Sequence, residues 1–361
     1  MFLFPTFLRR ISHQLPTLRN RRTFTDGVHR PNNGDKVVVA MSGGVDSSVT
    51  AALLSQIPGY DLSAIYMRNW DSADEDASTS PFPCAWEKDW DDVQRVCKCL
   101  DIPVKMVDLS KEYWGRVFQP SLHYWEKGWT PNPDVWCNKE VKFGALLDKV
   151  DEVIGMTGAW LATGHYARTD FDHRENLPRL LRHPSPKDQT YYLSSIPLRA
   201  LKRTLFPLGN LPPVPSTSSL LSSYNLTPNQ SLPKPLIRTL ASAFSLPTAN
   251  NSESMGICFV GERRRFADFV SQYIPPEPGP ILHVVTGEEV GKHQGIWEYT
   301  IGQGAKLPGL RERLFVARKE KEGNKVWVAP LYVPSLSFRA RYNRHSSQKP
   351  SLSSHEFFDH Q

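Results

Sequence analysis

Two kinds of hydrophobic pattern alternate along the first half of the chain. Continuous apolar runs, typical of buried parallel strands, occupy residues 36–42, 62–70, 102–110 and 159–167. Between them, apolar residues recur three or four positions apart, which predicts helices over residues 47–57, 85–100, 111–128 and 139–150. Pro120 is expected to kink or break the third helix, because proline lacks a backbone N–H. This alternation predicts an α/β domain built on a mainly parallel sheet.

The pattern changes in the second half. Residues 179–196 favour two short strands around a turn, and the proline- and serine-rich residues 207–235 favour a loop or linker. Short helices are predicted over 236–245 and 263–274. Strand-like segments then follow at 281–291, 296–304, 313–320 and 325–330, and they predict a small β domain.

These changes give the expected domain boundaries. The α/β domain is expected over residues 31–200, and a central region with the Pro/Ser-rich insertion over 201–275. The β domain is expected over 276–345 and a disordered tail over 346–361.

Charge separates the first thirty residues from the rest. The whole chain has a net charge of +6, but residues 1–30 hold six arginines and only one acid, leaving 37 basic and 36 acidic residues elsewhere. Arginine-rich, acid-poor composition is typical of a mitochondrial presequence, so we expect the matrix as the location. A disordered basic tail and a secretory signal are the weaker alternatives.

The apolar runs are too short to span a bilayer, and five cysteines in a reducing compartment should be thiols.

A glycine–serine turn joins the first strand to the first helix. "SGGVDSS" (42–48) supplies two glycines for close approach to a ligand, hydroxyl donors, and the free N–H groups of a helix start. It lacks the lysine of the common P-loop. A merely structural turn is the alternative.

The complete "SGGVDSS" resembles the PP-loop of the ATP-pyrophosphatase superfamily, whose members split ATP into AMP and pyrophosphate while adenylylating a substrate. The resemblance implies an adenine nucleotide alpha-hydrolase-like fold and a role for Asp46 with Mg2+. It also implies ATP contacts from Ala40, Met41, Ser42, Gly43, Gly44, Val45, Asp46 and Ser47.

Two cysteines have settings that favour a reactive thiolate. Cys137 follows "TPNPDVW" and precedes the helix expected from Asn138, close to Lys139 and Lys142. Cys258 lies beside the arginines of "GICFVGERRR". The alternative interpretations of these two cysteines are a metal ligand and a buried apolar residue. For Cys84, Cys97 and Cys99 we expect burial.

Six further stretches extend the resemblance over about residues 36–310: "YMRNW" (66–70), "TPNPDVWCNKEVKF" (130–143), "ATGHYAR" (162–168), "KDQTYYL" (187–193), "LFPLG" (205–209) and "SESMGICFVGERRRF" (252–266). Together they resemble tRNA-specific 2-thiouridylase, most closely its mitochondrial form.

The resemblance implies ATP-dependent replacement of the C2 oxygen of a wobble uridine by persulfide sulfur. Cys258 receives the sulfur, Cys137 assists its release, and Asp134 is the general acid/base. Met67 and Gly164 are expected at the adenosine, and His165 is either there or structural. The residues expected to contact tRNA are Asn132, Pro133, Asp134, Lys187, Asp188, Gln189, Arg341 and Tyr342.

The implied partners are mitochondrial tRNAs of the Lys, Glu and Gln type and a persulfide donor, either a sulfur-relay protein or a cysteine desulfurase. An iron–sulfur cluster using Cys137 and Cys258 ranks second. The alternative functions are another PP-loop adenylylating enzyme and a truncated tRNA-binding homologue. Gly304 replaces the arginine usual in the family, and the β domain is expected to be shortened, with residues 331–361 departing from the family pattern.

Overall fold

The computed structural model describes residues 30–70, 85–154, 158–172, 174–212, 224–251, 266–309 and 312–330. Cys84, Cys258, Arg341, Tyr342, the expected tail and residues 1–29 of the expected presequence lie outside these ranges.

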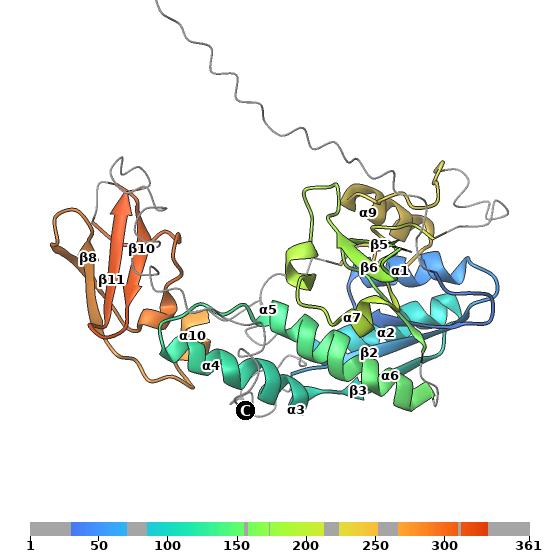
Figure 1. Ribbon diagram of the computed structural model, residues 1–361, viewed down its shortest axis with the longest axis horizontal. Helices are drawn as coiled ribbons and strands as arrows, with labels where there is room; N and C mark the ends of the chain where they lie inside the picture. Colours follow the sequence, from blue (N-terminus) through green and yellow to red (C-terminus); the bar gives the residue numbers. More distant parts are fainter. Residues whose placement is uncertain are drawn as a thin grey trace, which may run out of the picture.

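A parallel five-stranded sheet forms the centre of the N-terminal domain (Figure 1). Its strands are β1 (Lys36–Met41), β2 (Asp61–Arg68), β3 (Val104–Asp108), β4 (Trp160–Thr163) and β7 (Thr204–Leu205), in the order β3-β2-β1-β4-β7. The chain first adds strands on one side of β1 and then returns to its other side. The edge between β1 and β4 is therefore the topological switch point, where open α/β sheets bind ligands at the carboxyl ends of their strands.

Helices cover both faces of this sheet. Successive β1 residues point to opposite faces, so Val37 and Val39 join one core cluster and Val38 the other. The first cluster packs beneath α1 (Val45–Ser55), α2 (Ala85–Leu100) and α9 (Lys234–Ala243). The predicted parallel α/β domain is confirmed.

The helix predicted to kink or break at Pro120 continues through it. It consists of α3 (Ser110–Tyr113), a π-helical turn (Trp114–Phe118) and α4 (Gln119–Glu126). Gln119 N–H bonds to the Trp114 carbonyl, five residues back. Because this wider turn precedes Pro120, the proline falls at the start of α4, where its missing N–H removes little.

The helix expected from Asn138 begins earlier, at Pro133. It runs through α5 (Pro133–Trp136), a π-helical segment (Cys137–Ala145) and α6 (Leu146–Ile154). Asn132 caps it by accepting hydrogen bonds from the N–H groups of Asp134 (3.1 Å) and Val135 (3.3 Å). Asparagine at the N-cap followed by proline at the first helical position is a helix-start signature. The prolines therefore start the helix, and Cys137 lies within its second turn.

A hairpin replaces the two strands expected over 179–196. β5 (Arg168–Asp172) pairs antiparallel with β6 (Leu177–Leu181), while Thr190–Leu193 form a 3-10 turn and Leu198–Leu201 form α7. The first strand of the pair thus lies earlier than predicted. The later segment turns because Thr190 N–H and Oγ1 both bond to the Asp188 carboxylate.

The C-terminal sheet is mixed, with the order β10-β11-β8-β9. Its strands are β8 (Gly279–His283), β9 (Glu289–His293), β10 (Leu314–Glu320) and β11 (Lys325–Pro330). Residues 296–304 do not form the predicted strand. Ile296–Glu298 are a 3-10 turn with Ile296 and Trp297 buried, and pairing is limited to a Gly304–Phe315 bridge.

Figure 1 shows the β domain at one end of the molecule, with α4 and α10 (Phe266–Val270) between it and the α/β domain. Within the described ranges, every helix is too short or too polar to cross a membrane.

The two cysteines at the end of α2 differ in exposure. Cys97 is buried, as expected, and burial raises the pKa of its thiol to about 11. Cys99 is exposed, so the expectation of burial was wrong for it. Two positions along a helix turn a side chain by about 200°, which places the pair on different faces.

Candidate active site

The PP-loop turns sharply from β1 into α1, after Ala40 and Met41 at the carboxyl end of β1. Gly43 has a φ of +75°, and a Cβ there would lie 2.9 Å from the Asp89 Cα. Within the loop, Ser42 N–H donates to the Ser47 hydroxyl at 3.1 Å, and Ser47 donates to the Gly44 carbonyl at 3.1 Å. Bonds that cross the turn hold its backbone in one shape.

Asp46 is the charged residue of the loop, and two side chains from distant segments reach it. Lys234 Nζ, at the start of α9, lies 2.7 and 2.9 Å from the two carboxylate oxygens. The hydroxyl of the buried Tyr166 donates to Oδ1 at 2.8 Å. Lys234 thus brings to this loop the positive charge that its own sequence lacks. The sequence interpretation missed both residues, because no local pattern links position 234 or 166 to position 46.

The loop after β4 presses against the PP-loop backbone. A Cβ on Gly164 would lie 2.8 Å from both the Asp46 carbonyl carbon and the Ser47 nitrogen. Only glycine fits such an approach without displacement. Gly164 lies at the PP-loop, which is compatible with its predicted place near the nucleotide. Met67, the other residue predicted there, lies near the carboxyl end of β2 and is partly buried.

Asn251 connects the PP-loop to α2. Its Nδ2 group donates to the Gly43 carbonyl at 3.3 Å and to Asp92 Oδ2 at 2.9 Å. Asp92 is buried in α2 and also pairs with Lys88 and Arg95. The sequence interpretation missed this connection too. Asn251 directly precedes the segment that contains Cys258, so the PP-loop contacts the residue after which that segment begins.

His165 occupies the space between the PP-loop and the helix that carries Cys137. Its Nδ1 lies 2.8 Å from the Thr163 hydroxyl, and its ring centroid lies 6.0 Å from that of Phe143. Burial and the nearby charge of Lys142 hold the pKa of His165 well below its usual value. The imidazole is therefore neutral near pH 7.

Asp134 and Cys137 lie one helical turn apart on the helix that Asn132 caps. Burial raises the pKa of the Asp134 carboxyl, and the charge of Lys142 opposes that rise. Cys137 is only 5% exposed. Because the helix begins at Pro133, its free N–H groups lie nearer Asp134 than Cys137. The helix start therefore does not stabilise a Cys137 thiolate as the sequence suggested.

Next to Cys137, the side chain of Asn138 carries a hydrogen-bond acceptor that receives no donor from the described residues. Its Nδ2 group donates to the Tyr192 carbonyl at 3.0 Å, and because a carbonyl only accepts, this bond fixes the amide orientation. The side chain is buried, yet among the described residues its Oδ1 has no hydrogen-bond partner. A buried acceptor without a donor costs roughly 1–3 kcal/mol. A donor on a bound substrate would remove that cost.

The residues predicted to contact tRNA after β6 also stabilise the fold. Gln189 Oε1 accepts a hydrogen bond from the Tyr166 N–H, and the Gln189 N–H donates to the Tyr166 carbonyl, at 2.9 Å each. Asp188 accepts from His183 N–H at 3.0 Å. Burial tends to raise the pKa of Asp188, but hydrogen bonds from Thr190 and His183 outweigh it, and the pKa is lowered. Lys187 lies above the Tyr166 ring, 5.5 Å from its centroid.

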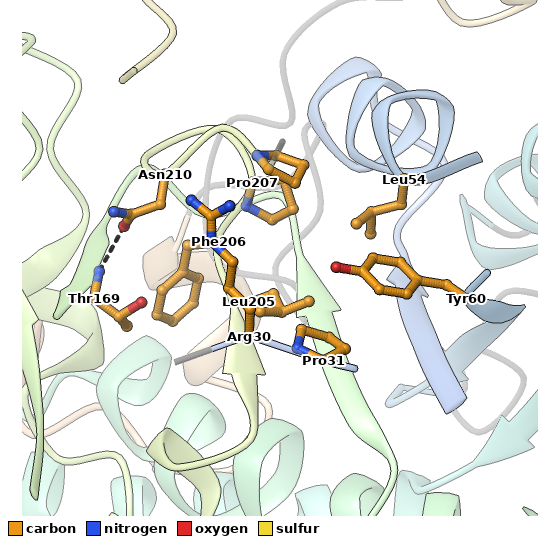
Figure 2. A pocket seen from close by; sticks show the side chains of 10 residues that line it. Arg30, Pro31, Leu54, Tyr60, Thr169, Leu205, Phe206, Pro207 and Asn210 are labelled. Carbon is orange, nitrogen blue, oxygen red and sulfur yellow. Dashed lines mark hydrogen bonds between the residues drawn. The ribbon is translucent and has the colours of Figure 1, made fainter. Parts of the chain in front are cut away.

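A small cavity lies away from this site. Figure 2 shows Arg30, Leu54 and Tyr60 around it, with Asn210 bonded to Thr169. Leu54 and Tyr60 lie where α1 ends and β2 begins, far along the sheet from the PP-loop. Its volume of about 20 Å³ suits one water molecule, and it has no place in the chemistry.

Magnesium fits here only in company with phosphates. In the parts of the chain that the structure describes, no three His, Cys, Asp or Glu side chains gather as a metal site. Asp46 offers one carboxylate, and Mg2+ in nucleotide enzymes is commonly held by one or two carboxylates together with the substrate phosphates. The donor set therefore suits a metal that arrives with a nucleotide.

A PP-loop at the switch point of a parallel sheet defines an α/β protein of the PP-loop class. Residues 35–214 match the tRNA methyl transferase HUP domain family, and residues 267–330 match the tRNA methyl transferase PRC-barrel domain family. The "tRNA-specific 2-thiouridylase MnmA" of Lacticaseibacillus paracasei is 39% identical over 90% of this chain and 80% of its own length. That of Alkaliphilus oremlandii is 42% identical over 81% of this chain and 72% of its own length.

The chain belongs to the tRNA-specific 2-thiouridylase family. One solved structure, "U34-tRNA thiolase NcsA from Methanococcus maripaludis with its 4Fe-4S cluster", resembles 69% of this chain and 67% of that chain at 18% identity. Its TM-score of 0.36 is too low to support an argument.

Proposed function

We propose that this chain carries out the ATP-dependent 2-thiolation of the wobble uridine of mitochondrial tRNAs, releasing AMP and pyrophosphate. As a member of its family it is a tRNA-uridine 2-sulfurtransferase. The observation that carries the mechanism is the contact of Gly164 with the PP-loop. Gly164 is followed by His165, so this contact brings the PP-loop close to His165. The charge of Lys142 lowers the pKa of both His165 and Asp134, which indicates that these two side chains lie near the same lysine.

In the first step, the C2 oxygen of uracil attacks the α-phosphorus of ATP, and pyrophosphate leaves. The PP-loop N–H groups and Lys234 hold the phosphates and offset their charge. Mg2+, when bound with ATP at Asp46, supplies further charge neutralisation to the leaving pyrophosphate. To contact the phosphates, Lys234 must give up part of its contact with the Asp46 carboxylate.

In the second step, the terminal sulfur of a Cys258 persulfide attacks C2 and expels AMP. The Cys137 thiolate then attacks Cys258 Sγ and breaks the S–S bond, so the outer sulfur stays on C2. A Cys137–Cys258 disulfide forms, which an external thiol reduces. Asp134 accepts or donates the accompanying proton, and its raised pKa suits that role. The alternative outcome, release of free sulfide, uses the same two cysteines.

Asn138 suits recognition of the target base. Its buried Oδ1 accepts hydrogen bonds, whereas uracil differs from cytosine by carrying a donor at N3. We include this bond in the proposal because it would satisfy the unpaired acceptor next to Cys137. The persulfide comes from a relay protein or a cysteine desulfurase, and residues 1–30 direct the chain to the matrix.

The test is product formation by purified protein with ATP, a persulfide donor and mitochondrial tRNA. Mass spectrometry of the nucleosides should find 2-thiouridine with the unchanged chain and none with Cys137→Ser. Cys99→Ser, an exposed cysteine outside the site, is the matched control and should retain activity. Pyrophosphate release should survive in Cys137→Ser, because the first step needs no thiol. Full product formation by Cys137→Ser would reject the mechanism and favour another PP-loop adenylylating reaction.

A further inference from the structure

An open cleft lies next to the start of the Cys137 helix, and the proposed function leaves it unused. Its volume is about 320 Å³. Its walls include Tyr124, Trp129, Thr130, Asn132, Trp136 and Tyr191, which we call the aromatic cleft. Trp129 is 62% exposed and Tyr191 is 66% exposed. Both rings line one cleft, and exposed apolar side chains that gather in one place mark binding sites, whereas scattered ones do not.

Two helix ends fix the shape of the aromatic cleft. At the end of α4, Gly128 has a φ of +77°, Trp129 N–H bonds to the Tyr124 carbonyl at 2.9 Å, and Gly128 N–H bonds to the Trp125 carbonyl at 2.8 Å. This is a Schellman cap. It places the Trp129 ring against Tyr124, with centroids 5.3 Å apart, and the Trp136 ring also lies 5.3 Å from that of Tyr124. The rings are therefore preorganised.

Asn132, Val135 and Trp136 line the cleft, whereas Asp134 and Cys137 are not among its lining residues. Two positions along an α-helix turn a side chain by about 200°, so Trp136 projects away from Asp134. The occupant of the aromatic cleft is therefore a group next to the target base and not the target itself.

Positive charge lies at the edge of the cleft. Lys319, on β10 of the β domain, donates to the Thr130 hydroxyl at 3.0 Å and to the Tyr299 carbonyl at 2.7 Å. Burial lowers the pKa of Lys319 to about 8, so it is charged at pH 7. Lys127 is exposed two residues before Trp129. Aromatic faces combined with basic groups are the features that bind single-stranded nucleic acid.

We propose that the aromatic cleft stacks an unpaired base of the RNA loop that flanks the target uridine, with Trp129 and Tyr191 supplying the ring faces. This inference deepens the proposed function and rests on it. Extruding the target base separates it from its neighbours in the stack, and a second stacking site on the enzyme replaces part of the lost contact. Asn132 carries amide N–H donors at the wall, which suit the acceptors on a base edge.

The first experiment measures the Kd of the full chain for a mitochondrial tRNA transcript. Trp129→Ala and Tyr191→Ala should each weaken binding by roughly 5- to 150-fold, the usual effect of losing one stacked base. Trp129→Phe keeps a ring face and should bind much more tightly than Trp129→Ala. Val285→Ala removes a side chain that is also 66% exposed, on the β domain away from the cleft, and should leave the Kd unchanged.

The second experiment replaces single loop nucleotides beside the target with abasic ones. One abasic position should weaken binding about as much as Trp129→Ala, and combining the two should cost little more, because both remove the same contact. An unchanged Kd for Trp129→Ala, or additive losses at every abasic position, overturns the proposal. So does a Trp129→Ala variant that binds tRNA normally but binds a persulfide-carrying protein poorly, because the cleft would then be a protein site.

These outcomes are separable from the proposed function. If the unchanged chain forms 2-thiouridine while Trp129→Ala binds tRNA normally, only the stacking site is rejected. If the unchanged chain forms no 2-thiouridine, the proposed function is rejected, and the coupling to an abasic position still decides whether the cleft binds a base.

Discussion

Lys234 contacts the PP-loop from a distant part of the sequence. It lies 188 positions from Asp46, yet its ammonium contacts both carboxylate oxygens, and only 15% of its side chain is exposed. In common P-loops the lysine lies within the loop itself. Here α9 brings it to a loop that has none.

Replacing Lys234 by methionine should therefore weaken ATP binding. A hydrogen bond between charged groups is worth roughly 1.5–3 kcal/mol, which corresponds to about 10- to 150-fold in Kd. Calorimetry with a non-hydrolysable ATP analogue and Mg2+ measures it. Lys292→Met, at an exposed lysine of β9, is the control. Equal affinity in the two variants would show that Lys234 only stabilises Asp46.

Lys142 should set the working pH of Asp134. Its charge lowers an aspartate pKa that burial raises, so Lys142→Met should raise that pKa further. If the Asp134 carboxylate acts as the base, the acidic limb of the kcat/KM profile moves to higher pH, because more of the carboxyl stays protonated. Lys149→Met, on the exposed side of the same helix, should leave the limb in place. A limb that does not move in Lys142→Met excludes Asp134 as the titrating group.

Asn138 offers a test of base recognition. Asn138→Ala removes the acceptor proposed for uracil N3–H together with the bond to Tyr192, while Asn138→Asp keeps an acceptor. We expect Asn138→Ala to lose most of its preference for a target uridine over cytidine in tRNA competition binding. Asn138→Asp should retain more of it. Equal preference in both variants would assign Asn138 a purely structural role.

At the scale of elements, the contact between the β4 loop and the start of α1 assembles the site. Gly164→Ala would place a methyl group 2.8 Å from the PP-loop backbone. Such overpacking costs about 1–3 kcal/mol and should also weaken ATP binding by displacing Ser47. Denaturant unfolding and nucleotide titration measure the two effects.

Gly115→Ala is the control for that substitution. Gly115 lies in the π-helical turn before α4, where a Cβ meets open space. Alanine there should be neutral or stabilising by about 0.5–1 kcal/mol. If Gly164→Ala behaves like Gly115→Ala, the close approach at Gly164 is not what holds the loop.

At the scale of the molecule, the α/β domain and the β domain meet close to the aromatic cleft. Ile296, in the 3-10 turn where a strand was expected, packs against Gly128, and Lys319 reaches Thr130 from β10. The turn and the strand therefore both contact the segment that leads to Asn132. The predicted tRNA contacts at Arg341 and Tyr342 lie outside the described residues and stay predictions.

Localisation concerns the molecule as a whole and is tested with its first thirty residues. Residues 1–30 fused to a fluorescent protein should carry it into mitochondria, because an arginine-rich, acid-poor segment is drawn inward by the membrane potential. Replacing the six arginines by glutamine should leave the fusion in the cytosol. Import of the substituted fusion, or cytosolic retention of the original, would reject the presequence.

The sequence alone determined much of the α/β domain. β1, β2, β3, β4 and α2 follow predicted segments because buried parallel strands and amphipathic helices have distinct, local hydrophobic periods. "SGGVDSS" likewise contained its own turn and helix start. Local pattern failed at 296–304, where buried Ile296 and Trp297 belong to a turn that packs on another segment. At Asn132–Pro133 the helix-start signal was present in the sequence, but the helix was expected only from Asn138.

Only the tertiary structure brought the site together. Asp46, Tyr166, Lys234 and Asn251 come from separate parts of the chain and meet at the carboxyl end of β1. The order β3-β2-β1-β4-β7 determines that meeting, because it sets the β4 loop beside the PP-loop and lets α9 pack on α1. Such contacts depend on long-range packing, and the local spacing of residues does not encode them.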